Sequence, residues 1–281
     1  MITKELQKKI DNSIRLLKAT CGDDVVEVAY SGGKDSDVIL QLAKEAGIKY
    51  RAIYKNTTID PPGTIKHCME MGAEIVQPKK TFAEIVQESG APNRFRRICC
   101  DKLKEYKILD KAIMGIRKDE STKRNKRYQE PTECRFFGSK KNHVNAIYPI
   151  LDWTLEDVVE FLTDRKIKCA PAYYDEQGNF HPERRLGCMC CPLASRNNRI
   201  NFFKEKPKMV RFYLRNMKIY LDTHKDSRAY EINDGNPYCW FVRDVFYNDN
   251  NEGWKAVNNG LFEKPNYKQF LEDYFKINLD V

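Results

Sequence analysis

The chain has 281 residues, of which 41% are hydrophobic and 32% charged, and its formal net charge is +9. This length suits one large domain or two small ones, and fifteen Tyr and fourteen Phe argue against a mainly disordered chain. No apolar run is long enough for a membrane-spanning helix, and the charged first residues do not resemble a signal peptide. We therefore expect a cytoplasmic protein without a membrane partner, in which metal ligands or catalytic thiols explain the high number of cysteines, ten in all, better than disulfides do.

The first half of the chain alternates between strand and helix patterns. Apolar residues at helical spacing predict an opening helix that ends near Gly22, and the apolar run at residues 24–30 predicts a buried strand. The next helix should stop at Gly47. Further helices are expected at residues 63–71 and 81–88, with strands at 49–54, 73–76, 111–116 and 146–150. This pattern predicts an α/β fold with a doubly wound, mainly parallel sheet that binds ligands at the carboxyl ends of its strands.

The second half of the chain has a different character. A helix capped by Thr154 is followed by a loop rich in Pro, Gly and Cys over residues 168–195. Residues 197–221 are expected to be helical with a break at Pro207, the aromatic residues 238–247 to be strand-like, and residues 267–275 to form a last helix. We place a nucleotide-binding domain at residues 1–153 and a mostly helical C-terminal part at residues 154–281.

Positive charge is concentrated in three runs. Residues 94–107 carry a net charge of +4, residues 117–141 carry +5, and residues 196–218 carry +7, whereas residues 219–281 carry −4. A solvated helix face would explain any single run. Three separate runs favour a surface for phosphates, which belong either to a nucleotide or to a nucleic acid.

Residues 31–36 read Ser-Gly-Gly-Lys-Asp-Ser and connect the first strand to a helix. Gly32 and Gly33 let backbone N–H groups approach an anion, the helix adds its positive N-terminal end, and Lys34 adds a full charge. Asp35 suggests a magnesium ligand or an orienting group, and two hydroxyl donors complete the loop, Ser31 and Ser36. A capped glycine turn is the alternative, but this composition between strand and helix predicts a phosphate-binding loop.

Five of the cysteines form two groups. Cys99 and Cys100 are adjacent, and Cys188 and Cys191 form a CxxC pair that contains Cys190. A CxxC loop presents two thiolates to one metal centre, but adjacent cysteines serve a single ion poorly because their side chains diverge. A 4Fe–4S cluster is a larger target whose different irons neighbouring cysteines can reach. The pattern favours a cluster held by Cys99, Cys100, Cys188 and Cys191, with a zinc site and unligated thiols as alternatives. The other five are expected to be buried, namely Cys21, Cys68, Cys134, Cys169 and Cys239.

The loop at residues 31–36 resembles the PP-loop of the adenine nucleotide α-hydrolase superfamily, whose members bind ATP and cleave it to AMP and pyrophosphate. The resemblance implies that the loop holds the phosphates of ATP with Mg²⁺ and that Lys34 and Asp35 act in catalysis. It also implies that residues after the second strand lie beside the nucleotide, namely Asn56, Thr57 and Asp60.

The cysteine pattern on such a loop resembles the cluster-containing phosphoadenylyl-sulfate (PAPS) and adenylyl-sulfate reductases over about residues 24–195. In that family all four cysteines hold a 4Fe–4S cluster. A second segment that starts at Gly115 is similar to the family's G-x-R-x-x-E/Q-S-x-x-R segment, which handles the anionic end of the substrate. The resemblance therefore implies a substrate-binding set of Arg117, Glu120, Ser121 and Arg124.

The end of the chain departs from the reductases, which carry a nucleophilic cysteine in a Glu-Cys-Gly-x-His motif, because no cysteine follows Cys239. This favours an ATP-using enzyme that adenylates an anionic acceptor, releases pyrophosphate and handles sulfur, with an electron- or sulfur-donor protein as partner. The loop is also of the type seen in the ATP sulfurylase small subunit and the DNA phosphorothioation ATPases. One alternative is a reductase with a displaced nucleophile, either Cys190 or Cys239. Another is a nucleic-acid-binding accessory subunit that uses the basic residues 196–218.

Overall fold

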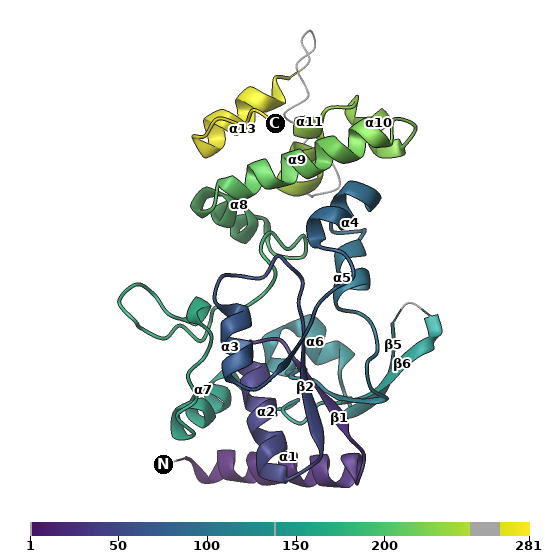
Figure 1. The fold of residues 1–281 in the computed structure, drawn as a ribbon. Helices are drawn as coiled ribbons and strands as arrows, with labels where there is room; N and C mark the ends of the chain where they lie inside the picture. Colours follow the sequence, from purple (N-terminus) through teal and green to yellow (C-terminus); the bar gives the residue numbers. More distant parts are fainter. Residues whose placement is uncertain (1, 138, 248–264) are drawn as a thin grey trace. The chain divides into compact units, whose positions relative to one another are not determined.

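The computed structural model describes residues 2–137, 139–247 and 265–281 (Figure 1). The chain forms two compact units, and each combines two separate segments. Unit 1 comprises Met1–Pro78 and Leu103–Gly187, and unit 2 comprises Lys79–Lys102 and Cys188–Val281. This division does not coincide with the expected boundary at residue 153, since residues 154–187 belong to unit 1 and residues 79–102 to unit 2.

A six-stranded sheet forms the centre of unit 1, with strand order β3-β2-β1-β4-β6-β5. Its strands are β1 (Val26–Tyr30), β2 (Tyr50–Lys55), β3 (Glu74–Val76), β4 (Lys111–Ile113), β5 (Thr132–Phe137) and β6 (Ser139–Ile147). All neighbours pair in parallel except β5 and β6, which are antiparallel. The predicted α/β fold with a mainly parallel sheet is confirmed. Because the strand order reverses between β1 and β4, the carboxyl end of β1 is where such sheets bind ligands.

The helices of unit 1 are α1 (Lys4–Cys21), α2 (Lys34–Ala46), α3 (Thr64–Glu70), α6 (Thr122–Arg127) and α7 (Leu155–Asp164), with short 3₁₀ turns η1 (Lys118–Glu120) and η2 (Pro171–Tyr173). Local signals set their ends. Thr3 caps α1, Gly47 ends α2 in the left-handed conformation, and Thr154 forms a capping box with Asp157 at the start of α7.

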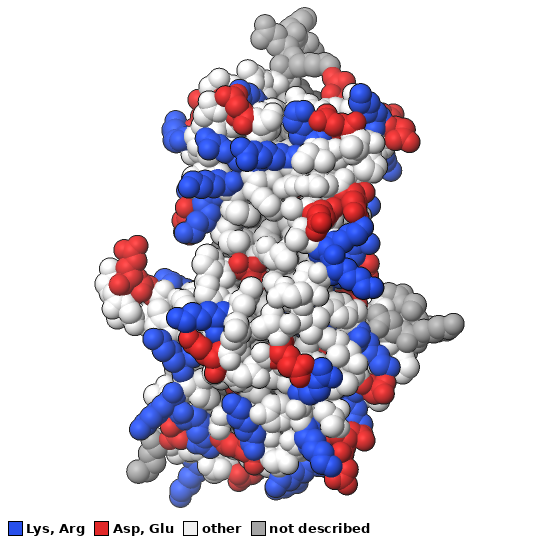
Figure 2. Space-filling view, viewed as in Figure 1, with Lys and Arg blue, Asp and Glu red and all other residues white. Residues whose placement is uncertain are grey.

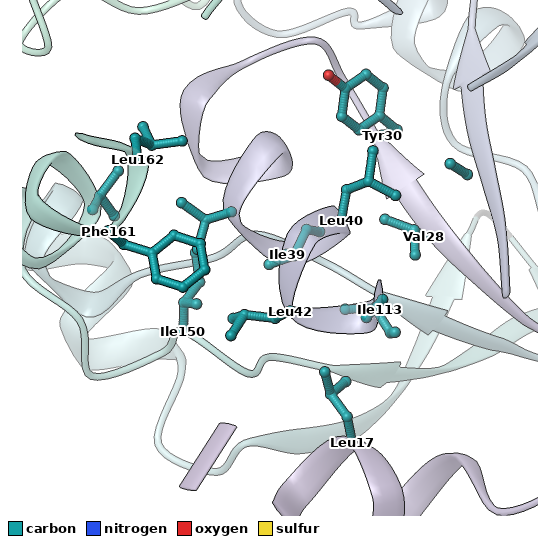
Figure 3. Packing of buried hydrophobic residues seen from close by; sticks show 14 of the residues in the cluster. Leu17, Val28, Tyr30, Ile39, Leu40, Leu42, Ile113, Ile150, Phe161 and Leu162 are labelled. Carbon is teal, nitrogen blue, oxygen red and sulfur yellow. The ribbon is translucent and has the colours of Figure 1, made fainter. Parts of the chain in front are cut away.

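The core of unit 1 fixes the position of α2 (Figure 3). Ile39 and Leu42 of α2 are buried in one cluster with Leu17 of α1, Val28 of β1 and Phe161 of α7. Since α2 is held by two helices and the central strand, its first turn is held beside the carboxyl end of β1. That first turn carries the predicted phosphate loop.

Unit 2 is helical, as predicted for the C-terminal part. It contains α4 (Phe82–Ser89), most of α5 (Ile98–Leu103), α8 (Arg196–Glu205), α9 (Lys208–Thr223), α10 (Arg228–Asn233), α11 (Pro237–Trp240), η3 (Phe241–Tyr247) and α13 (Tyr267–Phe275). Its core is aromatic, with Phe203 packed edge-to-face against Tyr213, Phe241 and Phe275. Among the helices described in either unit, none combines the length and the apolar character needed to cross a bilayer.

The prediction of strand-like structure at residues 238–247 is wrong. Asn236 caps α11 and Pro237 occupies its first position, and the chain continues into the π-helical segment η3. Trp240, Phe241 and Phe246 are buried in the aromatic core. Aromatic residues favour strands only where a pleated surface is available to pack against, and here the helical core overrides that preference.

Candidate functional site

The loop between β1 and α2 is a tight glycine-containing turn that leads directly into the helix. Gly33 precedes the first helical residue, Lys34, and Ser36 Oγ donates to the Gly33 carbonyl at 2.7 Å. Gly32 has a φ of +73°, and a Cβ at this position would lie 3.0 Å from Cys68 Sγ, so that a larger residue would be strained. The loop therefore needs its first glycine for both backbone conformation and space.

A cavity of about 340 Å³ in unit 1 opens beside this loop. Three cations line it, namely Lys34, Arg124 and Arg185, together with two carboxylates, Asp35 and Glu120. The Lys34 side chain is buried, with Nζ 3.3 Å from Asp35 Oδ2 and 5.5 Å from the centre of the Tyr173 ring. The structure thus brings residues of the predicted phosphate loop and of the predicted substrate-binding set into the lining of one cavity. Arg185 was missed by sequence reasoning because it lies in an irregular loop with no motif.

Arg117 does not line this cavity, although it was expected to bind the acceptor. It is 3% exposed, and its Nε lies 2.6 Å from Asp35 Oδ1 while its Nη1 lies 3.0 Å from Asp119 Oδ2. Burial opposes the charge of Arg117, but the carboxylate of Asp35 outweighs this effect and raises the pKa of the guanidinium. Arg117 therefore positions the Asp35 side chain without itself lining the cavity.

Glu120 organises the other wall of the cavity. It forms an ion pair with Arg124, and its carbonyl oxygen accepts a hydrogen bond from Arg185 Nη2 at 2.8 Å. Ser121 Oγ accepts from the Arg124 backbone N–H at 3.2 Å and so caps α6. Of the predicted substrate-binding set, Glu120 and Arg124 line the cavity, and Ser121 shapes the helix that presents Arg124.

The residues after β2 build their own loop. Asp60 Oδ2 accepts from Tyr54 Oη at 2.5 Å and from the Thr57 N–H at 3.1 Å, and Asn56 Nδ2 donates to Gln77 Oε1 at 2.8 Å. Asn56 and Thr57 are almost fully buried. None of Asn56, Thr57 and Asp60 is among the residues lining the cavity at the loop, so their predicted place beside a nucleotide remains a prediction.

A second cavity of about 250 Å³ lies over the sheet and shares Ala29 and Ser31 with the first. Part of its lining consists of small or apolar residues in the strands or directly after one, namely Ala29, Ile53, Ala112, Met114 and Val144. Lys55 borders it, with Nζ 3.1 Å from the buried Glu27 Oε1 and 4.6 Å from the centre of the Tyr106 ring. The loop cavity is therefore mostly polar, whereas the sheet cavity joins an apolar surface to charged residues that include Lys55 and Arg135.

A buried hydrogen-bond network connects the two ends of the β1–α2 loop to α3. Tyr30, the last residue of β1, donates to Asp37 in the first turn of α2. His67 of α3 places Nε2 at 3.0 Å from Asp37 Oδ1 and 3.1 Å from Tyr30 Oη. Burial raises the pKa of the Asp37 carboxyl, although the hydrogen bonds from His67 and Tyr30 act against this rise. The network ties both ends of the loop to α3.

The four predicted cluster ligands all belong to unit 2, where Cys99 and Cys100 lie on α5 and Cys188 and Cys191 lie in the loop before α8. The pKa of Cys99 is raised by its hydrogen bond with Cys100, by burial, and by the charges of Cys100 and Cys188. The pKa of the enclosed Tyr213 is raised by burial and then by the charges of four cysteines, Cys190, Cys99, Cys191 and Cys188. Both α5 and the CxxC loop therefore approach the same region of unit 2.

The described residues contain no group of three or more His, Cys, Asp or Glu side chains arranged to hold a metal ion. The 4Fe–4S cluster expected at Cys99, Cys100, Cys188 and Cys191 therefore stays a prediction. Cys190 is buried, and its φ of +58° places a left-handed residue inside the CxxC loop, where the chain turns. Outside these groups, Cys21, Cys68, Cys169 and Cys239 are buried as predicted, whereas Cys134 is exposed because its position on β5 faces away from the core.

The fold and the site together define an α/β protein with a cationic cavity at the carboxyl edge of a parallel sheet. The family described as the phosphoadenosine phosphosulfate reductase domain matches residues 26–194, and the chain belongs to this family. No curated protein matches the chain. Among solved structures, the PAPS reductase from Candida auris in its phosphate complex is 13% identical, with a TM-score of 0.43, and the match covers 67% of this chain and 96% of that one.

Proposed function

We propose that the protein is an enzyme that binds ATP with Mg²⁺, transfers the adenylyl group to an anionic acceptor with release of pyrophosphate, and handles sulfur by means of a 4Fe–4S cluster. The observation that carries the proposal is the convergence of Lys34, Arg124 and Arg185 on the cavity beside the β1–α2 loop. Such a cationic space at the end of a central strand suits a polyphosphate.

The loop side of the cavity would hold the phosphates. The N-terminal end of the 13-residue helix α2 and the Lys34 ammonium would both attract the negative charge of the phosphates there. An acceptor oxygen would attack the α-phosphorus, and the bond from that phosphorus to the bridging oxygen of pyrophosphate would break. Lys34, Arg124 and Arg185 would stabilise the charge that develops on the leaving pyrophosphate, which is electrostatic rather than covalent catalysis.

The sheet side would hold the base. The adjoining cavity meets the loop at Ala29 and Ser31, so a ligand anchored at the loop can extend into it. Alanines at positions 29 and 112 leave space above the sheet that larger strand residues would fill. A flat aromatic ring such as adenine, whose faces can pack on apolar side chains and whose edges can bond polar ones, suits this lining.

Asp35 and Glu120 would hold the magnesium ion. Both line the loop cavity, and Mg²⁺ in nucleotide sites commonly takes one or two carboxylates together with phosphate oxygens. When bound, the ion would offset phosphate charge. Arg117 and Lys34 would keep Asp35 in one orientation, because each contacts a different oxygen of its carboxylate.

Cys99, Cys100, Cys188 and Cys191 would hold the cluster. When bound, it would supply electrons or sulfur to the reaction or stiffen unit 2. Its support is the family membership together with the approach of α5 and the CxxC loop to Tyr213.

The test uses protein purified and reconstituted without oxygen. We expect calorimetric titration to show binding of Mg²⁺–ATP, and a coupled assay to show pyrophosphate release with anionic acceptors. Lys34→Ala should weaken ATP binding about tenfold or more, since hydrogen bonds to charged groups contribute roughly 1.5–3 kcal/mol. Lys44→Ala, an exposed lysine on the same helix, should leave binding unchanged. Wild-type protein that neither binds ATP nor releases pyrophosphate would refute the proposal.

A second candidate function is a reductase acting on PAPS or adenylyl sulfate. It needs a reactive thiolate, and burial followed by the charge of Cys191 raises the pKa of Cys190, which disfavours that residue as the nucleophile. Cys239 is buried in α11. Sulfite release from PAPS that disappears in Cys239→Ser would favour the reductase over ATP-dependent adenylation.

A further inference from the structure

A groove on unit 2 lies between α4 and α9 and shares no residue with the two cavities described above. Its volume is about 460 Å³. Three cations line it, Lys208, Arg211 and Arg215, and so do three apolar side chains, Ala83, Phe212 and Ile219. Figure 2 shows Lys and Arg side chains gathered over α8 and α9.

The three cations lie on one exposed face of α9. The opposite face is buried in the core of unit 2 through residues that include Val210, Leu214 and Met217. Spacings of three and four residues place the cations in a row about 10 Å long, given a rise of about 1.5 Å per residue. The row follows from the helix itself, so it is a preformed feature of the surface.

Few acidic groups offset this row. Arg211 Nε donates to the Asn278 carbonyl at 2.7 Å. The pKa of the Asp280 carboxyl is lowered mainly by hydrogen bonds from Lys268 and Asn278, and the charge of Arg211 lowers it further. Lys208 and Arg215 have no ion-pair partner among the described residues, and none of the carboxylates described lines the groove. The groove therefore carries uncompensated positive charge.

An aromatic ring lies beside the cations. Phe212 is half-buried and lines the groove, while its ring stacks on Phe82 of α4 with centroids 6.3 Å apart. The Phe82 contact holds the Phe212 ring in place. A row of cations next to a supported aromatic ring matches a chain that alternates phosphates with flat bases.

We propose that this groove binds single-stranded nucleic acid, with backbone phosphates on Lys208, Arg211 and Arg215 and a base against Phe212. An acidic polypeptide would satisfy the cations but would bring no flat ring to Phe212. A duplex would present phosphates but would keep its base faces stacked inside. The proposal does not depend on ATP binding in unit 1.

The test measures fluorescence anisotropy of a labelled 20-nucleotide single strand with the full chain over a series of salt concentrations. Three phosphate contacts predict a slope of log affinity against log salt of about −2. The charge-reversed variant Lys208→Glu/Arg215→Glu should bind at least tenfold more weakly with a shallower slope. Phe212→Ala should weaken binding severalfold with the slope unchanged, because the ring contributes stacking rather than charge.

The matched control is Lys8→Glu/Arg15→Glu on α1, a Lys–Arg pair with the same seven-residue spacing, the same exposure and the same change in charge. Normal binding by this control supports the groove as the site. An equal loss in both double variants would show attraction to net charge only and would overturn the proposal. Tighter binding of a labelled polyglutamate or a duplex than of the single strand would also overturn it, in favour of those partners.

Discussion

Asp35, which lines the loop cavity, is held from three directions. Its carboxylate oxygens meet Arg117 Nε and Lys34 Nζ, at 2.6 Å and 3.3 Å. Its backbone carbonyl lies directly against Gly115, where a Cβ would be only 2.9 Å from the carbonyl oxygen. The position of Asp35 therefore depends on ion pairs to two buried residues, Arg117 and Lys34, and on the absence of a side chain at Gly115.

We predict that Gly115→Ala damages the site. The added Cβ would meet the backbone of Asp35, which cannot give way as a flexible side-chain end would. Such overpacking costs roughly 1–3 kcal/mol in the free energy of unfolding, and the displaced loop should bind ATP at least tenfold more weakly. Urea unfolding and calorimetric titration measure the two effects.

Gly187→Ala is the control for this substitution. A Cβ at Gly187 meets no atom within 4 Å, and the backbone there does not need the left-handed conformation. Its effect on both unfolding and ATP binding should be within the error of the measurements. Similar losses in the two variants would contradict the claim that contact with Asp35 is the cause.

Individual site residues were predictable where a motif sets both their spacing and their surroundings. Lys34 lies at the start of a helix after a strand, and this local context is visible in the sequence. The motif around Arg117 gave its neighbourhood but not the direction of its side chain, which points to Asp35. Arg185 reaches the cavity from an irregular loop, and only tertiary contacts bring it there.

Among the elements, α2 is the one on which the loop cavity depends. Its N-terminal end carries the loop, and its other end is tied to α7 by Arg165, whose Nε and Nη2 donate to Glu45 Oε1 and Oε2 at 2.8 Å and 3.2 Å. Burial raises the pKa of Glu45, but the hydrogen bonds from Arg165 and Gln41 and the charge of Arg165 outweigh it and lower the pKa overall. The pair is partly buried and bidentate, the geometry in which ion pairs contribute most.

We predict a pH-dependent loss of stability in Arg165→Ala. Because the folded-state pKa of Glu45 is lowered, its contribution is present above the unfolded value of 4.5 and is lost as pH falls through the folded value. The variant should be about 1 kcal/mol less stable than the wild type at pH 7, and this difference should shrink towards pH 3. Urea unfolding over this pH range provides the measurement.

A double-mutant cycle with Glu45→Gln isolates the pair from the other contacts of Arg165, which include the Phe161 ring and Asp164. The coupling energy should be favourable at pH 7 and close to zero at pH 3. A coupling energy that is close to zero already at pH 7 would show that the other contacts of Arg165, such as the Phe161 ring, account for the loss.

Long elements with clear caps were the most predictable. The last helix at residues 267–275 and the break at Pro207 were both predicted and are confirmed, because apolar spacing and proline act locally. The short helix α5 was not predicted, since six residues carry too little periodicity to recognise. The segment at 238–247 was predicted incorrectly because the preference of aromatic residues depends on what they pack against.

The whole molecule keeps its two candidate chemistries in different units. The residues lining the loop cavity belong to unit 1, and the four predicted cluster ligands belong to unit 2. The family match at residues 26–194 includes residues of both. Sequence patterns predicted the fold class but not this division, because a unit built from two distant segments is defined by long-range contacts alone.

We predict that hydrogen exchange separates the two sites. Mg²⁺–ATP should slow exchange in the peptides covering residues 29–36 and 115–124 of unit 1, because a ligand stabilises the segments that it contacts. Loss of iron should speed exchange in residues 98–102 and 188–195 of unit 2. Mass spectrometry of apo, iron-reconstituted and ATP-bound protein resolves both responses.

Two variants provide the controls for this experiment. Lys34→Ala should abolish protection by ATP and keep the response to iron, and Cys99→Ser/Cys188→Ser should do the reverse. If ATP gave the same protection pattern in Lys34→Ala as in the wild type, the assignment of the loop would fail. If iron had no effect on residues 98–102, the cysteine assignment would fail while the loop assignment could stand.

The interrupted units impose an order on biosynthesis. During translation, the unit 2 segment Lys79–Lys102 is synthesised directly after the first segment of unit 1. The remainder of unit 2, Cys188–Val281, follows only after the second segment of unit 1. The main partner of α4 in that remainder is α9, so the early segment emerges without the helix that will cover it. Cys99 and Cys100 lie in the same early segment and are made well before Cys188 and Cys191. Any metal centre that needs all four cysteines is loaded only after residue 191 has been made, which makes its insertion a late step in the maturation of the protein.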